Sequence, residues 1–130
     1  MGKGRILLVE DNTDNFELVR FLLERQGYEV LAARNGIQAV EMACSELPDL
    51  VLMDLSMPEK DGWTACLEIK ADPRTRDIPL VALTAHTLPG DRKRALELGF
   101  EGYVYKPINL PSLEETIANV LAAKQNPRQG

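Results

Sequence analysis

The sequence predicts an α/β fold in which a doubly wound, five-stranded parallel sheet carries helices on both faces. Three observations support this prediction. Short apolar runs alternate with helix-patterned segments along the chain, the central runs are apolar at consecutive positions, and glycine or proline marks many of the boundaries. A strand that is covered on both faces loses the alternation of a half-exposed strand, and Leu50-Val51-Leu52-Met53 is a run of that kind.

The expected strands and helices follow one another in strict alternation. Apolar runs rich in aliphatic and β-branched residues predict strands at residues 5–9, 28–31, 50–53, 80–83 and 103–105. Helical spacing of apolar residues predicts helices over about residues 12–26, 36–46, 62–71, 91–98 and 111–123. Gly27 and Gly99 stand where the first and fourth helices are expected to end.

The first helix has one arc that we expect to face the sheet. At about 100° per residue, this arc gathers four aliphatic residues: Leu18, Val19, Leu22 and Leu23. Phe16 falls at the edge of the arc and Phe21 almost opposite to it. An exposed pair of phenylalanines is commonly incidental, and the alternative is a surface for a partner or for a second copy of the chain.

Length, composition and charge bound the possible functions. At 130 residues, 45% hydrophobic and 27% charged, the chain fits one globular domain. We expect this domain over residues 5–123, with an N-terminal tail at residues 1–4 and a polar C-terminal tail at residues 124–130. The net charge of -5 argues against direct binding to nucleic acid. Apolar runs are too short for insertion into a membrane or for a signal peptide.

Cysteine usage indicates a reducing environment. Cys44 and Cys66 are isolated from each other, and His86 is the single histidine of the chain. This set predicts neither a disulfide framework nor a zinc site. We therefore expect a cytoplasmic location.

Polar residues follow the predicted strands where a parallel sheet places its functional crevice, at the carboxyl ends of the strands. Glu10-Asp11 follows the first strand, Asp54 the third, Thr84 the fourth, and Lys106 the fifth. At an effective dielectric constant of about 20, two carboxylates about 5 Å apart repel by roughly 3 kcal/mol. The cluster therefore calls for a cation, and oxygen ligands without histidine or cysteine favour Mg²⁺.

The same residues suggest phosphoryl chemistry. Beside Mg²⁺, the Asp54 carboxylate is the best candidate nucleophile for attack on phosphorus, giving an acyl phosphate. Lys106 would place a positive charge on the phosphoryl oxygens, and Thr84 would donate a hydrogen bond to one of them.

Five motifs, in this order and spacing, resemble the receiver domains of bacterial two-component response regulators. They are Leu8-Val9-Glu10-Asp11-Asn12, the segment from Asp54 through Ser56-Met57-Pro58 to Asp61-Gly62, Leu83-Thr84-Ala85, Gly102-Tyr103-Val104-Tyr105 and Lys106-Pro107. The resemblance spans roughly residues 5–123 and implies the (βα)5 flavodoxin-like receiver fold. Ile108 departs from the family pattern, in which many members have phenylalanine after the Lys-Pro pair.

The resemblance implies a role for each matching residue. Asp54 would be the phosphoacceptor, and Asp54 and Asp11 would bind Mg²⁺ directly. Glu10 would bind Mg²⁺ through water, and the backbone carbonyl of Ser56 would supply a further ligand. Thr84 and Tyr103 would form the switch pair, and the peptide bond between Lys106 and Pro107 would be cis.

The resemblance also implies a pathway and partners. The expected protein is a signalling phosphoacceptor rather than a metabolic enzyme, with self-catalysed phosphotransfer and slow autodephosphorylation. Its donor would be a histidine kinase or a histidine phosphotransfer protein, and its signal would pass to a downstream protein target by contact or by onward phosphotransfer. We expect a monomer or weak homodimer. His86, with Ser56, is a further candidate for tuning the attack of water on the acyl phosphate.

Several alternatives stand beside this reading. Taken singly, Asp11-Asn12 is a helix cap, Asp54 a turn residue and Lys106 a solvated surface residue; only the joint pattern favours function. An aspartyl-phosphate hydrolase of the haloacid dehalogenase type has a second aspartate two residues after the nucleophile, where this chain has Ser56. A flavodoxin-like cofactor binder lacks support because two acids occupy its phosphate-loop position. A receiver excised from a hybrid kinase would have the same fold.

Overall fold

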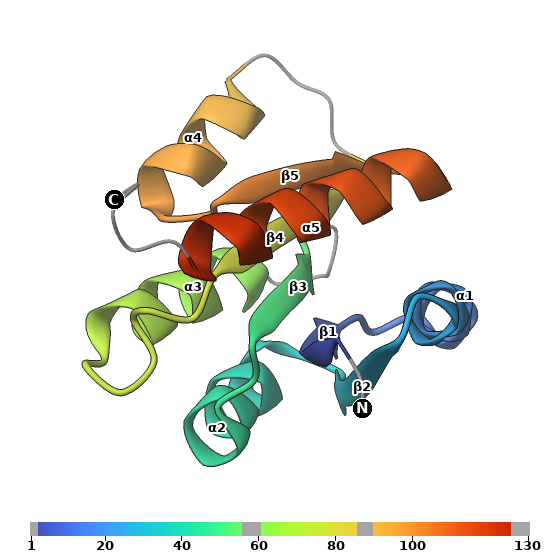
Figure 1. The fold of residues 1–130 in the computed structure, drawn as a ribbon. Coiled ribbons are helices and arrows are strands. Elements are labelled where there is room, and N and C mark those ends of the chain that lie inside the picture. Colours follow the sequence, from blue (N-terminus) through green and yellow to red (C-terminus); the bar gives the residue numbers. More distant parts are fainter. Residues whose placement is uncertain (1–2, 56–60, 86–89, 126–130) are drawn as a thin grey trace.

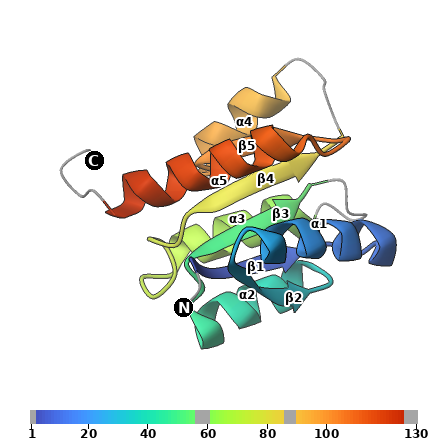
Figure 2. The ribbon, with the colours of Figure 1, turned by 45° about the vertical axis from the view of Figure 1, so that its right-hand side comes forward.

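The computed structural model describes residues 3–55, 61–85 and 90–125. Within these residues, five parallel strands form one sheet in the order β2-β1-β3-β4-β5, and five helices connect or follow them (Figures 1 and 2). The strands are β1 (Gly4–Val9), β2 (Tyr28–Ala33), β3 (Leu50–Asp54), β4 (Leu80–Thr84) and β5 (Gly102–Tyr105). The helices are α1 (Thr13–Arg25), α2 (Gly36–Glu46), α3 (Asp61–Ala71), α4 (Asp91–Leu98) and α5 (Leu110–Gln125). The predicted fold class is confirmed.

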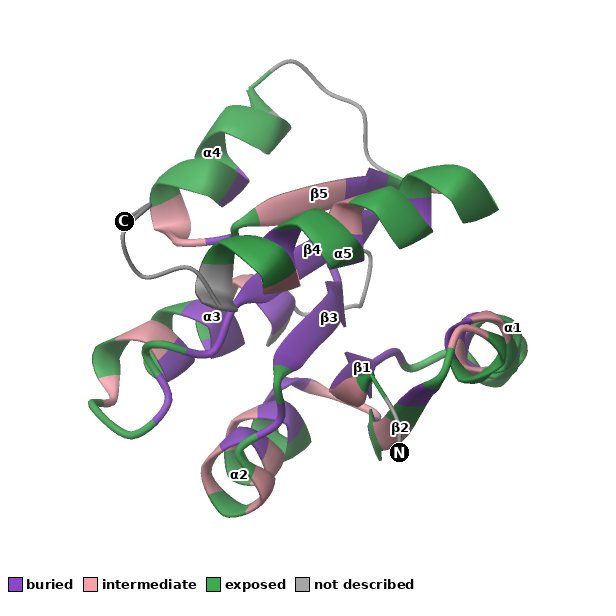
Figure 3. Ribbon diagram, in the orientation of Figure 1, coloured by how far each residue is buried: buried purple, intermediate pink, exposed green. Residues whose placement is uncertain are grey.

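Two apolar clusters fill the space between the sheet and its helices. On one face, α1 and α5 pack on the sheet through residues such as Val19, Leu23 and Ile117. On the other face, α2, α3 and α4 pack through residues such as Ala43 and Ile69. The central strand β3 is buried along its whole length (Figure 3), which explains its uninterrupted run of apolar residues.

The register of the sheet brings the carboxyl ends of the central strands to one edge. Val9 at the end of β1 pairs with Met53, which directly precedes Asp54. Asp54 in turn pairs with Leu83, the neighbour of Thr84 in β4. The residues that end or follow these strands therefore lie side by side, although they are far apart in sequence.

Strand and helix boundaries differ from the predictions by one or two residues. Strand β2 continues to Ala33 because its pairing with β1 runs on to Val9. Helix α1 begins after Asn12, whose side-chain oxygen accepts a hydrogen bond from the Asn15 N–H at 2.9 Å. The expected capping role of this segment thus belongs to Asn12, and the Asp11 carboxylate is left for another role.

The predicted inner face of α1 is wrong in part. Leu18 was expected to face the sheet but is 50% exposed, whereas Phe16, expected at the edge of the arc, is 5% exposed. The buried stripe is Phe16, Val19 and Leu23, which are spaced at i, i+3 and i+7. The helix is rotated toward Phe16, and Leu18 and Phe21 both lie on its exposed side.

Both cysteines are free thiols. Cys66 is buried on α3 and its thiol donates to the Leu98 carbonyl oxygen at 3.4 Å. Burial raises the pKa of the Cys66 thiol to about 11. Among the described residues, each helix falls short of the length and apolar character needed to cross a membrane.

A stability prediction concerns Leu47, which ends α2 in the left-handed region with φ 47° and is 55% exposed. A side chain in this region costs about 1–2 kcal/mol, so Leu47→Gly should stabilise the fold by about 0.5–1 kcal/mol after the greater flexibility of glycine in the unfolded chain is subtracted. Urea unfolding measures the difference.

Leu67→Gly is the matched control, because Leu67 is 52% exposed but lies inside α3. This variant should lose about 1 kcal/mol, since glycine disfavours a helix interior. Equal destabilisation by both substitutions would contradict the assigned strain at Leu47.

Candidate functional site

Three carboxylates meet at the carboxyl edge of the sheet. Glu10 and Asp11 follow β1, and Asp54 is the last residue of β3. One carboxylate oxygen from each residue lies within 4.8 Å of the others. Glu10 and Asp54 are each only 1% exposed, whereas Asp11 is exposed. The structure thus brings together the three acids that the sequence singled out.

Lys106 contacts two of these acids. Its Nζ donates to Asp54 Oδ2 at 2.8 Å and to Glu10 Oε1 at 3.3 Å. Burial alone lowers the pKa of Lys106, but its hydrogen bond to Asp54 and the attraction of both carboxylates outweigh burial and raise it. The ammonium group is therefore held in its charged form. The Lys106–Pro107 peptide bond is cis, as the resemblance implied.

Glu10 is the acid most affected by this crowding. Burial raises the pKa of its carboxyl group to about 7, and a hydrogen bond with the Asp54 carboxyl group acts in the same direction. The Asn12 N–H, which donates to Glu10 Oε2 at 3.1 Å, and the Lys106 charge act against this rise. In the metal-free site, the Glu10 carboxyl group is therefore partly protonated near neutral pH.

The donor set fits a hard divalent cation. All three carboxylates offer oxygen, and two of them are buried where their mutual repulsion is weakly screened. Burial keeps the pKa of Glu10 raised although the Lys106 charge lowers it, so Lys106 does not fully stabilise this carboxylate. A cation bound by two or three carboxylate oxygens would balance their charge, and Mg²⁺ suits such a partly solvated oxygen site.

Thr84 and Tyr103 lie on the strands beside this cluster. Thr84 ends β4, is 1% exposed, and its carbonyl oxygen accepts from the Lys106 N–H at 2.8 Å. Tyr103 lies on β5, partly buried against the core, with its ring centroid 5.0 Å from that of Tyr105. The predicted Ser56 ligand and His86 lie outside the described residues.

A family comparison accounts for this arrangement. The model of the response regulator receiver domain matches residues 6–118. The chain belongs to this family. It is 41% identical over 116 residues to the polar-differentiation response regulator DivK of Brucella anthropi, a match that covers 89% of this chain and 94% of that relative.

Solved receiver domains share the fold. The receiver domain of the sensor histidine kinase PA1611 from Pseudomonas aeruginosa PAO1 has a TM-score of 0.84 and 38% identity, covering 92% of this chain and 98% of that one. Its crystal structure has a magnesium ion coordinated in the active site cleft. The chemotaxis protein CheY4 of Vibrio cholerae has a TM-score of 0.82 and 27% identity, covering 89% and 97%.

One residue at the site of this receiver domain was missed by the sequence reasoning. The Arg34 Nη2 donates to the Asp11 carbonyl oxygen at 2.9 Å and to Thr13 Oγ1 at 2.8 Å. The available signal was position alone: Arg34 directly follows β2, whose carboxyl end lies at the same edge as that of β1.

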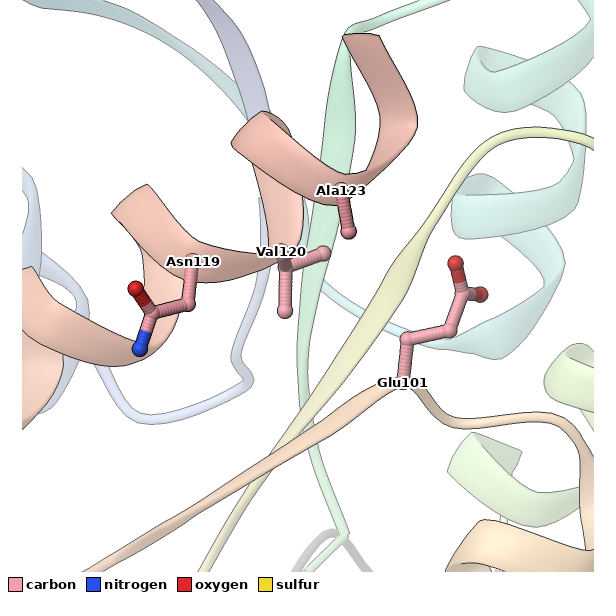
Figure 4. A pocket seen from close by; sticks show the side chains of 4 residues that line it. All are labelled: Glu101, Asn119, Val120 and Ala123. Carbon is pink, nitrogen blue, oxygen red and sulfur yellow. The ribbon is translucent and has the colours of Figure 1, made fainter. Parts of the chain in front are cut away.

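A separate cavity of about 390 Å³ lies at the opposite end of the sheet (Figure 4). Val120 and Ala123 extend from α5 toward Glu101, which precedes β5, and Asn119 completes the lining. The Glu101 carboxylate accepts from Lys70 Nζ at 2.8 Å. This cavity contains none of the site residues and belongs to the scaffold.

A pH dependence follows from Glu10. Its folded pKa of about 7 exceeds the value of 4.5 for a free glutamate, so the native state binds more protons between these limits. The stability due to Glu10 is therefore full below about pH 4.5 and is lost as the pH rises through about 7. In the presence of a chelator, the free energy of unfolding should fall between about pH 5.5 and about pH 8.

Glu10→Gln should flatten this fall, because the amide does not titrate in this range. Urea unfolding of both proteins at the two pH values measures how much of the pH dependence is due to Glu10 and its contacts. Identical pH dependence in the two proteins would contradict the raised pKa of Glu10.

Proposed function

We propose that this receiver domain accepts a phosphoryl group on Asp54 from a phosphohistidine, in a reaction that requires Mg²⁺. The observation that carries the proposal is the environment of Asp54. Its carboxylate is buried at the end of a central strand, contacts Lys106 Nζ at 2.8 Å, and lies beside Glu10 and Asp11. A buried, charge-paired carboxylate among further acids is costly for stability and is thus better explained by function.

We assign the metal ligands from this chain's own residues. Asp11 and Asp54 would bind Mg²⁺ directly and Glu10 through a water molecule, with the Ser56 carbonyl as a further ligand. When bound, the ion would offset the negative charge of the site and of the incoming phosphoryl group. The magnesium ion in the cleft of the PA1611 receiver domain supports this assignment.

Each residue of the site has a separate role in the proposed reaction. An Asp54 carboxylate oxygen attacks phosphorus, the phosphorus–nitrogen bond to the donor imidazole breaks, and an aspartyl phosphate results. Lys106 carries the charge needed to hold a phosphoryl oxygen, and the Thr84 hydroxyl donates to another. Slow hydrolysis by water would then return Asp54 to its carboxylate form.

The signal would leave through the β4 and β5 side of the molecule. Thr84 moving toward the phosphoryl group would let Tyr103 repack, changing the face formed by α4, β5 and α5. Leu96 and Tyr105 on this face are 46% and 45% exposed, as suits contact with a protein target. We assign the protein to the cytoplasm, as a monomer or weak homodimer that signals by contact or onward phosphotransfer.

The donor would dock beside α1. A cavity of about 170 Å³ next to Lys106 is lined by Leu18 and Val19 of α1 and by Pro107 and Ile108 after β5. Leu18 and Phe21 are 50% and 54% exposed. This apolar surface adjoins the site, so it suits a histidine kinase or a histidine phosphotransfer protein whose phosphohistidine must reach Asp54.

Acetyl phosphate provides the first test. Intact mass measurement should find a labile phosphoryl adduct on the wild type in the presence of Mg²⁺, and the adduct should disappear in Asp54→Asn and with a chelator. Asp77→Asn is the control, because it makes the same chemical change at an exposed position away from the site. An adduct that persists in Asp54→Asn would exclude Asp54 as the acceptor.

The docking surface can be tested by comparing a protein phosphodonor with acetyl phosphate, which is too small to need a docking surface. The double variant Leu18→Ala with Phe21→Ala should slow phosphotransfer from a phosphohistidine protein at least about tenfold, since central apolar contacts each contribute more than about 1 kcal/mol. Phosphorylation by acetyl phosphate should not change. Leu67→Ala on α3, similarly exposed, should affect neither. If the double variant accepted the phosphoryl group from the phosphohistidine protein as fast as the wild type does, this surface would be excluded as the docking site.

A further inference from the structure

We propose that Arg34 is a positioning residue, which holds the turn between β1 and α1 so that the Asp11 carboxylate stays at the cation site. The inference rests on the proposed function, because it concerns the affinity of that site for Mg²⁺. The guanidinium group of Arg34 donates to the carbonyl oxygen of Asp11 and to the hydroxyl of Thr13.

The hydrogen bonds of Arg34 join two separate turns. Both hydrogens of Nη2 are used, one toward the Asp11 carbonyl oxygen at 2.9 Å and the other toward Thr13 Oγ1 at 2.8 Å. These acceptors flank Asn12, the cap of α1. From the β2–α2 turn, Arg34 therefore holds the backbone of Asp11 before the cap and the side chain of Thr13 after it.

Contacts with Gln38 and Phe16 hold Arg34 itself in place. Its backbone N–H donates to Gln38 Oε1 at 2.7 Å, and the guanidinium carbon lies 5.7 Å from the centroid of the Phe16 ring. Phe16 is 5% exposed, so the ring is a fixed surface for the guanidinium. The contact also gives a reason for the rotation of α1 toward Phe16.

Asp11 is the acid that needs such support. Glu10 and Asp54 are buried at the edge of the core, whereas Asp11 is exposed. Before a cation binds, both buried carboxylates repel the Asp11 carboxylate. A turn free to relax would let the Asp11 carboxylate move toward solvent. Fixing the Asp11 carbonyl keeps its side chain near the other two, so less order must be created when the cation binds.

The sign of the effect separates positioning from simple charge. A guanidinium near an acidic cluster repels a cation, so removal of a bystander arginine would strengthen Mg²⁺ binding. Removal of a positioning arginine would weaken it, because residues that orient metal ligands typically contribute 10–100-fold in affinity. The two roles thus predict opposite changes.

Calorimetric titration of the unphosphorylated protein with MgCl₂ at about pH 8, above the pKa of Glu10, measures this affinity without any phosphoryl chemistry. Arg34→Ala should weaken binding about tenfold. Thr13→Val should weaken binding less. The double variant should lose less affinity than the sum of the two separate losses, because both substitutions remove the same hydrogen bond between Arg34 and Thr13. Arg34→Lys keeps the charge but loses the planar stack on Phe16 and should recover only part of the affinity.

Arg5→Ala is the matched control. Arg5 also donates from its guanidinium to a backbone carbonyl, that of Glu46, but at the other end of β1. Its removal makes the same change in net charge and should not weaken Mg²⁺ binding. Thermal unfolding of each metal-free variant confirms that it is folded.

Each outcome bears on a different claim. Absence of Mg²⁺ binding by the folded wild type would overturn the proposed metal site and this inference with it. Wild-type binding that Arg34→Ala leaves unchanged or strengthens would overturn the inference alone, as would full recovery in Arg34→Lys. A loss in Arg34→Ala that is absent from Arg5→Ala would support it.

Discussion

The structure depends on the burial of like charges at the ends of two adjacent central strands. Glu10 and Asp54 lie next to each other because β1 and β3 pair in parallel register, with Val9 opposite Met53. Neither acid can move into water without disrupting β3, which is buried along its length, or the buried carboxyl-terminal part of β1. Their repulsion is instead relieved by Lys106, by protonation of Glu10, and by any cation that the site admits. The pairing of parallel strands thus brings the charges of the cluster together.

The scaffold offsets this unfavourable cluster with two apolar layers. Helices α1 and α5 cover one face and α2, α3 and α4 the other, so the stability of the fold comes from surfaces that the site does not use. Polar contacts at the opposite end serve the scaffold as well: Lys70 Nζ donates to the carbonyl oxygen of Ile78 and to Glu101. Changes at the acid cluster therefore leave most of the packing intact, as a signalling site requires.

The sequence correctly predicted the features that follow from residue periodicity and from the residues at the ends of strands. The consecutive apolar residues of β3 identified a strand covered on both faces, and the acids after β1 and at the end of β3 identified the site. The predictions were wrong where side-chain packing determines which residues are buried. Four aliphatic residues defined an arc on α1, but Arg34 and the sheet favour burial of Phe16 over Leu18. The predictions missed Arg34 because hydrogen bonds to Asp11 and Thr13 cross between turns more than 20 positions apart, a distance at which no local pattern operates.

Lys106 links the site to the rest of the domain. Its ammonium group is bonded to Asp54 and Glu10, while its backbone N–H is bonded to the carbonyl oxygen of Thr84. A phosphoryl group would add about 1.5 to 2 negative charges at Asp54 and would compete for the same ammonium group. The backbone of Lys106 is tied to the end of β4 by this hydrogen bond and continues directly from β5. A change of charge at Asp54 would therefore act on the ends of β4 and β5 together, where Thr84 and Tyr103 lie.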